Sequence, residues 1–346
     1  MKVDYIIVGL GLAGLTFAEK LKQQNKSFVV FENNSQNSSK VAAGMFNPVV
    51  LKRFTAVWKG EEQLGFAKPI FQEIEKRFQK KYLYDVDIYR VFKSVEEQNN
   101  WFAKCDNPVL SNYMTTPIIK NDNSEVIAPF DYGRLTNTGK LDVHALLMDY
   151  ITYLEESKQL FLESFKHDAL QISKDSVSYK DIQAKKIVFC EGYGIKDNPY
   201  FSHLPLNEAK GELITIHAPK LAIDFLLKAA VFVLPIGEDL YKVGATFNWK
   251  DKTQIPSKEG KEELINKLKT TINTPYTIVD HVAGIRPTVK DRRPLIGSHS
   301  VYKNVAILNG LGTRGVMLAP TMAHQLFEYL ENNLSLDKEV DIRRFD

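Results

Sequence analysis

The spacing Gly-x-Gly-x-x-Gly occurs twice in this chain of 346 residues, once near each end. The six glycines are Gly9, Gly11 and Gly14, and Gly310, Gly312 and Gly315. Glycines in a turn between a strand and a helix let backbone N–H groups lie close to a phosphate or a flat ring. The two motifs therefore favour the binding of a nucleotide-type cofactor, and their surroundings show whether both have the same task.

The first motif has the full context of a dinucleotide site. An apolar run at residues 5–8 predicts a strand before it, and apolar residues at helical spacing follow it at Leu15, Ala18 and Leu21. A second predicted strand at 27–31 ends at Glu32, about 20 residues after the glycines, where a carboxylate binds the ribose hydroxyls of an adenosine. Strand, turn, helix, strand and acid in this order predict a pyrophosphate site at residues 9–14.

The second motif lacks part of this context. A strand is predicted at 305–308 and a helix at 316–330, but no further strand ending in an acid follows. What remains is a helix N-terminus, with unpaired N–H groups and a partial positive charge, presented by glycines. Such an end suits the part of a flavin where negative charge collects on reduction. A strand-to-helix turn without a ligand is the alternative.

Composition favours an ordinary globular enzyme. Charged residues make up 25% of the chain, hydrophobic residues 44%, and the net charge is +3, so nucleic-acid binding is not indicated. Cys105 and Cys190 are far apart and lack metal-ligand spacing, so we expect no metal site, no disulfide and a cytoplasmic location. Since the first predicted strand begins within a few residues of Met1, we expect no signal peptide, and residues 5–18 are too short to span a bilayer.

The remaining pattern predicts an α/β chain with two lobes. Helices are expected at 61–81, 142–156 and 258–271, and short strands at 84–92, 123–130, 212–216, 230–234, 240–246 and 276–283. The α/β stretches predict a Rossmann-like nucleotide-binding lobe of the glutathione-reductase type, formed by residues 1–82, 140–205 and 290–346. Residues 83–139 and 206–289 predict an interleaved α+β substrate lobe built on an antiparallel sheet.

Five stretches, in this order, carry a resemblance to a known family. They are Val8 to Gly14 with Glu32; Val41 to Met45; Val188 to Gly192; Lys210 to Glu212 with Val243 to Thr246; and Ala283 to Pro287 with Pro294 to Gly297, running on to Pro320. With these motifs the chain resembles the D-amino-acid oxidase and glycine oxidase family of FAD-dependent oxidoreductases over nearly its whole length. Residues 311–315 are also similar to the oxidase half of the bifunctional enzyme that completes methylaminomethyl-uridine in tRNA.

The resemblance implies FAD bound in an extended form. The residues that it places on the cofactor are Gly9, Leu10, Gly11, Leu12, Ala13 and Gly14 at the pyrophosphate; Glu32 at the ribose; Ala43, Gly44 and Met45 along the isoalloxazine ring; Gly312, Thr313, Arg314, Gly315, Val316 and Met317 at its N1 and C2 end; and Gly192. Residues 165–167 are expected to pass the adenine. Since no cysteine lies near residues 305–317, we expect the FAD to be non-covalent.

For the substrate, the resemblance implies that Arg286 binds a carboxylate, and a planar guanidinium suits this because it can bind both oxygens. A salt bridge within the sheet is the alternative for Arg286. Arg314 could assist the substrate or the flavin. Phe232 stands where glycine oxidase-like enzymes carry a tyrosine that helps to hold the carboxylate, so a second donor is expected elsewhere. Further candidates for lining the pocket are Tyr241, Asn248 and Trp249.

The reaction implied is oxidation of a C–N bond in an amino acid or related amine, by hydride transfer from the carbon beside the amine to flavin N5. A neutral amine needs no dedicated acid or base, since removing it from water favours loss of its proton. O₂ or another acceptor would reoxidise the flavin. Two alternatives remain open, an oxidase acting on a modified tRNA base and a non-catalytic flavin-holding subunit. The sequence does not indicate the oligomeric state.

Overall fold

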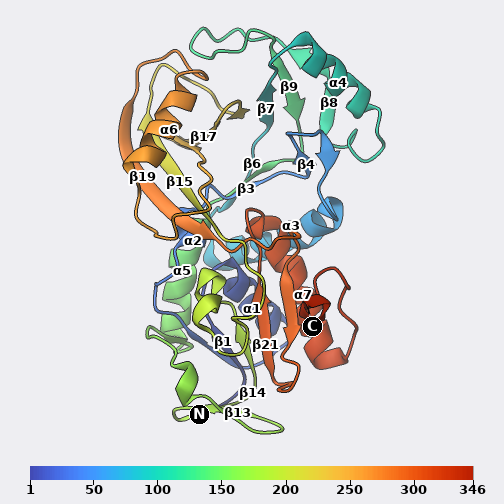
Figure 1. Ribbon diagram of the computed structural model, residues 1–346, viewed down its shortest axis with the longest axis vertical. Helices are drawn as coiled ribbons and strands as arrows, with labels where there is room; N and C mark the ends of the chain where they lie inside the picture. The colour runs from blue at the N-terminus through green and yellow to red at the C-terminus, as the bar shows by residue number, and fades with distance from the viewer. Residues whose placement is uncertain (346) are drawn as a thin grey trace.

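The computed structural model describes residues 1–345 and consists of two lobes stacked along the long axis (Figure 1). The lower lobe contains an eight-stranded sheet in the order β11-β2-β1-β14-β13-β12, in which β21 also pairs with β14 and β20 with β21. Its strands are β1 (Lys2–Val8), β2 (Phe28–Phe31), β11 (Leu160–Phe161), β12 (Gln171–Ile172), β13 (Val177–Tyr179), β14 (Ile182–Phe189), β20 (Leu295–Ser298) and β21 (Val305–Asn309).

The centre of this sheet is parallel and buried on both faces. Strands β2, β1, β14 and β21 run in the same direction, with Tyr5 opposite Phe28 and Val188 opposite Ala306. Tyr5 and Ile7 pack with the helices on one face, whereas Ile6 and Val8 pack on the other, as the alternation of a strand requires. The helices on the first face are α1 (Leu12–Gln23), α3 (Gly60–Phe78), α5 (Val143–Glu156) and α7 (Gly315–Asn332).

The upper lobe is a second sheet of eight strands in the order β19-β15-β18-β17-β16-β7-β9-β8, most of them antiparallel. The bounds are β7 (Ile88–Val91), β8 (Met114–Ile119), β9 (Tyr132–Leu135), β15 (Ala209–His217), β16 (Leu226–Lys228), β17 (Phe232–Gly237), β18 (Leu240–Gly244) and β19 (Thr277–Arg286). Helix α6 (Lys258–Leu268) packs Leu264 and Leu268 on one face. Leu213, Leu226 and Phe232 lie on the opposite face, in a cluster that includes Trp101 of α4 (Val95–Cys105).

Short elements join the two lobes. A three-stranded sheet consists of β3 (Met45–Phe46), β10 (Gly139–Leu141) and β6 (Leu83–Asp85), and β4 (Val49–Val50) pairs with β5 (Thr55–Ala56). The short helix α2 (Ser38–Val41) packs against β19. Short 3-10 turns lie at η1 (His167–Ala169), η2 (Gly192–Asp197) and η3 (Ile342–Phe345).

The predicted fold class, a Rossmann-like lobe with an antiparallel substrate lobe, is confirmed, and so are the three predicted helices α3, α5 and α6. The domain boundaries remain our proposal, which the separation of the two large sheets supports. The predicted strand at 84–92 is two strands, β6 and β7, and they belong to different sheets.

Two expectations for residues 84–135 are wrong. Residues 123–130 form no strand, and Val126 alone makes an isolated β-bridge, to Ile272. The backbone N–H groups of Asn123 and Glu125 donate to side chains of nearby asparagines, which replaces a strand ladder with local turns. Helix α4 was not expected, although Ser94 accepts from the N–H of Glu97 three residues on, a capping signal present in the sequence.

Candidate functional site

The candidate site is a cavity of ≈ 770 Å³ at the edge where four parallel strands end. Gly9 follows β1, Glu32 follows β2, Cys190 follows β14 and Gly310 follows β21. Ligands of open α/β sheets bind outside the carboxyl ends of the strands. From this edge the cavity extends to Gly211, Gly284 and Arg286 of the upper sheet, so both lobes contribute to one site.

The first glycine turn brings α1 directly to the cavity. Gly9 has φ +97, and a Cβ there would lie 2.5 Å from the carbonyl oxygen of Cys190. A Cβ on Gly14 would lie 2.0 Å from the carbonyl oxygen of Gly9, so any side chain would force helix and strand apart. The N-cap residue of α1 is Gly11, which has no side chain that could cap the helix. Gly11, Leu12 and Ala13 line the cavity. This helix end can therefore bind an anion.

Glu32 is buried and fixed by its neighbours. One carboxylate oxygen accepts from the N–H of Leu10 at 2.6 Å, and the other accepts from the N–H of Asn34 at 2.5 Å. Phe165 and His167 line the same end of the cavity. Glu191 also lines it, accepts from Asn198 Nδ2 at 2.7 Å and lies 2.9 Å from His167 Nε2. Hence Glu191 belongs to a polar cluster beside the cavity.

The second glycine turn lies against the first. A Cβ on Gly315 would be 3.0 Å from Leu12 Cδ1, and helices α1 and α7 pack against each other. Gly312, Thr313, Gly315 and Val316 line the cavity at the start of α7, whose N-cap residue makes no capping side-chain bond. Residues of both turns therefore line one cavity, as binding of one cofactor by the two turns would require.

Two residues of the second turn lie elsewhere than the sequence analysis expected. Met317 is buried in the helix core, and its side chain is not part of the cavity lining. The Arg314 side chain is not part of the lining either; burial, together with Arg292 and Arg293, lowers the pKa of its guanidinium. A direct role of Arg314 at the substrate therefore has no support in this geometry, although its backbone begins α7.

The segment Ala43–Met45 lines the middle of the cavity. Gly44 has φ +72, and a Cβ there would lie 1.9 Å from the carbonyl oxygen of Leu141. The N–H of Leu141 donates to the carbonyl of Gly44 at 2.9 Å. Strand β10 therefore holds this segment flat against the cavity, as a ring-binding segment requires.

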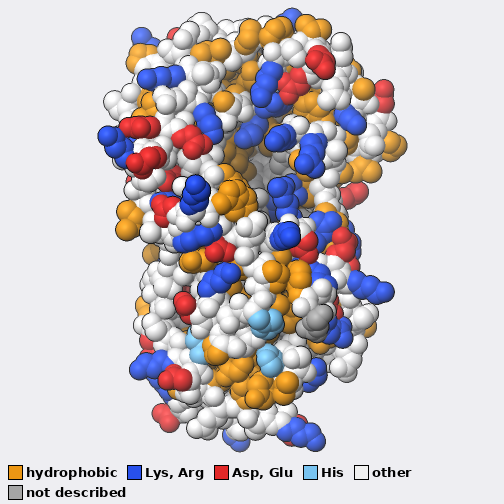
Figure 2. All heavy atoms as spheres, viewed as in Figure 1, with side chains coloured by type: hydrophobic (Ala, Val, Ile, Leu, Met, Phe, Trp, Pro, Cys, Tyr) orange, Lys and Arg blue, Asp and Glu red, His pale blue; other side chains and the backbone are white. Residues whose placement is uncertain are grey.

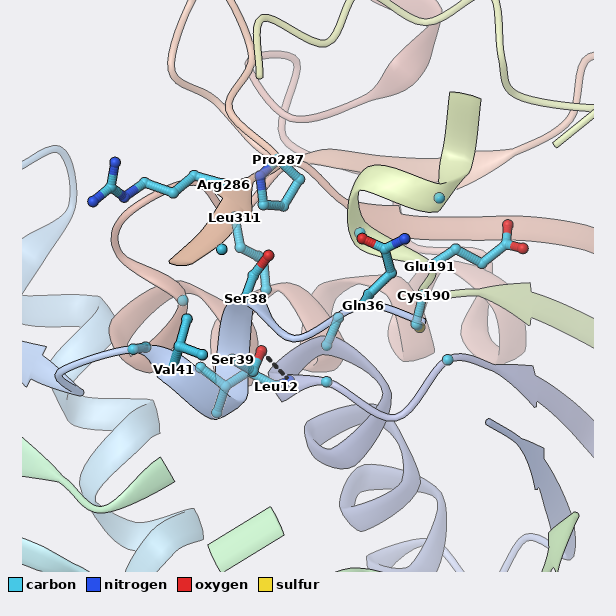
Figure 3. A pocket seen from close by; sticks show the side chains of 18 of the residues that line it. Leu12, Gln36, Ser38, Ser39, Val41, Cys190, Glu191, Arg286, Pro287 and Leu311 are labelled. Atoms are coloured by element: carbon cyan, nitrogen blue, oxygen red, sulfur yellow. Dashed lines mark hydrogen bonds between the residues drawn. The ribbon is translucent and has the colours of Figure 1, made fainter. Parts of the chain in front are cut away.

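Helix α2 connects the first glycine turn to the strand that carries Arg286. Ser39 Oγ accepts from the N–H of Leu12 at 3.2 Å, the bond drawn in Figure 3. Ser38 Oγ donates to the carbonyl of Ile285, and Asn37 Nδ2 donates to the carbonyl of Ala283 at 3.1 Å. Figure 3 shows Arg286 on one side of this bridge and Glu191 on the other, so the cavity is elongated between them.

Arg286 is a half-buried cation that lines the cavity. Its Nη1 donates to the carbonyl of Thr246 at 3.2 Å, and its guanidinium lies 4.8 Å from the ring centre of Phe247. No carboxylate within residues 1–345 pairs with it, so the alternative of a salt bridge within the sheet is not what the structure contains. Burial lowers the pKa of Arg286 to about 10, and a Cβ on Gly211 would lie 2.0 Å from its Nη2. Gly211 thus leaves the space in which the guanidinium lies.

The substrate end of the cavity is largely apolar. Its side chains on the upper sheet and the loop after β18 are Leu213, Lys228, Phe232, Ala245 and Phe247. Of the four residues expected to line the pocket, Phe232 does so, whereas Tyr241 faces the opposite side of the sheet in the core with α6. Asn248 and Trp249 are exposed and are not part of the lining. Lys228, Ala245 and Phe247 also line this end and were not expected there, because Lys228 is placed by the pairing of β16 with β17 and the other two lie in the loop after β18.

The residues present fit FAD. An elongated cavity with two helix N-termini, a buried carboxylate and a flat glycine-containing segment offers partners for a pyrophosphate, a ribose and a ring system.

Cys190 lies beneath the first turn with its thiol pKa raised by burial, and Cys105 is buried in the upper lobe. Within residues 1–345, no group of acidic, cysteine or histidine side chains could hold a metal ion. In the same range, no helix is long and apolar enough to cross a membrane.

Comparisons with known proteins agree with this geometry. A family model described as FAD dependent oxidoreductase matches residues 4–329. Glycine oxidase of Bacillus subtilis is 24% identical, over 99% of this chain and 95% of that protein. The crystal structure of glycine oxidase from Geobacillus kaustophilus superposes with a TM-score of 0.80 at 17% identity, covering 100% of this chain and 98% of that one. The tRNA 5-methylaminomethyl-2-thiouridine biosynthesis bifunctional protein MnmC of Campylobacter jejuni is 25% identical over 32% of this chain and 18% of its own length.

Proposed function

The chain belongs to the family of FAD-dependent oxidoreductases, and on this premise we propose that it oxidises the C–N bond of an amino acid or a related amine that carries a carboxylate. The observation that supports this substrate is the Arg286 guanidinium, which lines the cavity without a carboxylate partner within residues 1–345. A planar guanidinium binds both oxygens of a carboxylate and so fixes the orientation of the carbon beside it.

The residues of the cavity would bind FAD along its length. The first turn, Gly9 to Ala13, would take the pyrophosphate, Glu32 the adenosine ribose, and Ala43–Met45 with the start of α7 the isoalloxazine ring. Bound there, FAD supplies the acceptor for a hydride, and O₂ or another acceptor takes the electrons onward. Gly192 lines the cavity beside Glu191, on the adenosine side.

The walls around Arg286 would prepare the substrate amine. Leu213, Phe232 and Ala245 exclude water from the space beside the guanidinium, and removal from water favours the neutral form of an amine. A neutral amine can lose a hydride from the neighbouring carbon without a dedicated base. Binding by Arg286 and desolvation by these side chains are thus the two contributions that we assign to the protein.

The proposal is tested by an anaerobic panel of amino acids, N-methyl amino acids and amines, read as loss of flavin absorbance in the FAD-loaded protein. We expect carboxylated amines to bleach the flavin, and an Arg286→Ala variant to lose most of this reduction at the same concentration. If carboxylated amines reduce both forms equally, the role of Arg286 is wrong. If no amine bleaches the flavin, a non-catalytic flavin-holding subunit becomes the better account.

An oxidase acting on a modified tRNA base is the second candidate. It is favoured by the similarity to the bifunctional tRNA-modifying protein and by the Lys and Arg side chains around the hollow in the upper half of Figure 2. Such a protein should bind tRNA with an affinity that falls steeply with salt, because phosphate contacts release counterions. Binding that is absent, or that does not change with salt, would remove this candidate.

A further inference from the structure

Lys228 is a second unpaired cation in the cavity. It is the last residue of β16, it lines the cavity, and its Nζ lies 5.8 Å from the ring centre of its cross-strand neighbour Phe232. No carboxylate within residues 1–345 forms an ion pair or hydrogen bond with it. Lys228 faces the same side of the sheet as Leu226, two residues before it, and not the side covered by α6.

Strand register places Lys228 across the cavity from Arg286. Lys228 is opposite Phe232, Phe232 is opposite Gly244, and Gly244 is opposite Leu213 of β15. Three steps between neighbouring strands separate the backbones of β16 and β15 by roughly 14 Å. The Arg286 guanidinium lies over Gly211, two residues from Leu213 along β15. The two cations are therefore too far apart to share one carboxylate.

The surface between the two cations is apolar. The Phe232 ring and the Leu213 side chain both reach the space above Gly244, where a Cβ would lie 2.9 Å from the ring and 2.0 Å from Leu213 Cδ2. Phe232 has no polar atom to offer a ligand, so Lys228 is the polar group of this wall. A ligand that lies across this surface meets a cation at each end.

The surroundings of Lys228 favour the entry of an anion. Its neighbour on β7 is Arg90, which forms an ion pair with Glu97 at 2.7 Å and is thereby neutralised. Lys228 has no such partner, and burial, with Arg90 and Lys267 as further cations, lowers the pKa of its ammonium to about 8. A cation held largely out of water without a carboxylate partner is unfavourable until a negative group pairs with it.

We propose that the substrate carries a second carboxylate, which Lys228 binds while Arg286 binds the carboxylate next to the amine. The inference rests on the proposed function, because it names the substrate class of the same site. The substrate is then an amino acid or N-substituted glycine with an acidic group at its far end. Lys228 is in this account a residue that determines specificity and takes no part in the transfer itself.

The test measures binding and oxidation separately on the FAD-loaded protein. Binding of glutarate is compared with binding of its neutral-ended analogue 4-carbamoylbutanoate, by perturbation of the flavin absorbance. Reduction is compared between aspartate and asparagine and between glutamate and glutamine, each as both enantiomers, without oxygen. Each pair has nearly the same shape and differs by one negative charge.

We expect the wild-type protein to prefer the acidic member of each pair by about tenfold or more. Lys228→Met should abolish the preference, so that the acidic and the neutral-ended member of each pair bind and react alike, and Lys228→Arg should retain most of it. Lys267→Met is the matched control, since it removes a positive charge from the opposite side of the same sheet, and it should keep the preference. If Lys228→Met slowed the acidic and the neutral-ended substrates equally, Lys228 would act in the chemistry itself and the proposal would be overturned.

The outcomes also separate this inference from the proposed function. If amines reduce the flavin but the wild type shows no preference for the acidic member, the second-carboxylate proposal fails alone. If no amine reduces the flavin, the proposed function fails, while glutarate binding still reports whether Lys228 recognises a carboxylate. Flavin content and the thermal midpoint of each variant are measured first. If a variant does not fold, the preference of the wild type for the acidic member of each pair tests the proposal by itself.

Discussion

The two ends of the cavity are built from different parts of the chain. The end at the lower sheet consists of backbone at strand ends, where Gly11 and the start of α7 line the cavity. The end at the upper sheet consists of side chains on one sheet face, with Arg286 and Lys228 separated by Phe232. A backbone site tolerates no added atoms, whereas a side-chain site can change its specificity by single replacements. A replacement at the cofactor end should therefore abolish cofactor binding, whereas a replacement at the substrate end should change substrate specificity gradually.

The largest effect is expected for Gly9→Ala at the cofactor end. The new Cβ would lie 2.5 Å from the Cys190 carbonyl oxygen, at a φ of +97 that disfavours side chains. The strain alone costs about 1–3 kcal/mol. We expect the purified variant to retain less than about a tenth of the wild-type flavin, measured as flavin absorbance per protein.

Gly65→Ala is the control for this replacement. A Cβ on Gly65 meets nothing within 4 Å inside α3, so the variant should keep its flavin and gain about 0.5–1 kcal/mol of stability. Equal flavin in Gly9→Ala and Gly65→Ala would show that the cofactor end does tolerate added atoms, and the contrast between the two ends would fail.

The next largest effect is expected for Arg286→Met at the substrate end. Loss of a charged partner for the substrate carboxylate should weaken binding of the transition state by about 2–5 kcal/mol. This lowers kcat/KM for amino acids by a factor of at least about thirty. Flavin content should not change, because Arg286 lies at the other end of the cavity from Glu191. Amines without a carboxylate serve as the control and should react equally with both forms. If Arg286→Met lost flavin, the two ends of the cavity would not be independent.

An intermediate effect is expected from pH. The folded-state pKa of Lys228 is lowered to about 8, so its positive charge is present below pH 8 and is lost as the pH rises through that value. The dissociation constant of glutarate should then rise by up to about tenfold per pH unit above pH 8, until the pH reaches the higher pKa of Lys228 in the complex. Lys228→Arg should flatten the profile, since an arginine stays charged. Identical profiles for the two proteins would contradict the assignment of Lys228.

The smallest effect is expected for Ser94→Ala, which removes the cap of α4 without touching either end. Ser94 Oγ accepts from the N–H of Glu97, and loss of such a cap costs about 1 kcal/mol. Chemical denaturation should detect this loss, while flavin content and glutarate binding stay as in the wild type. A change in either would mean that the upper sheet transmits small disturbances to its cavity face.

The same contrast explains what could be predicted from the sequence. The spacing of Gly9, Gly11 and Gly14 and the acid at Glu32 depend on local geometry, so the pyrophosphate turn, the first helix and the fold class follow from them. Tyr241 was expected at the pocket and lies on the opposite face, because one residue along a strand reverses the direction of a side chain. Lys228 was missed because its place depends on the pairing of β16 with the distant strand β7, and Phe247 because it lies in a loop after β18. Helix α4 was missed although its capping signal, Ser94 and Glu97, was present in the sequence.

The contact between Leu12 and Gly315 has a consequence for how the protein is made. Residues from the second turn of the site leave the ribosome some 300 residues after the first. Until they appear, the face of α1 that packs on α7 has no cover, and β14 has no β21 beside it. Loading of the cofactor is therefore a late event in biosynthesis, and an interrupted chain would expose apolar surface to chaperones and proteases before any flavin could protect it.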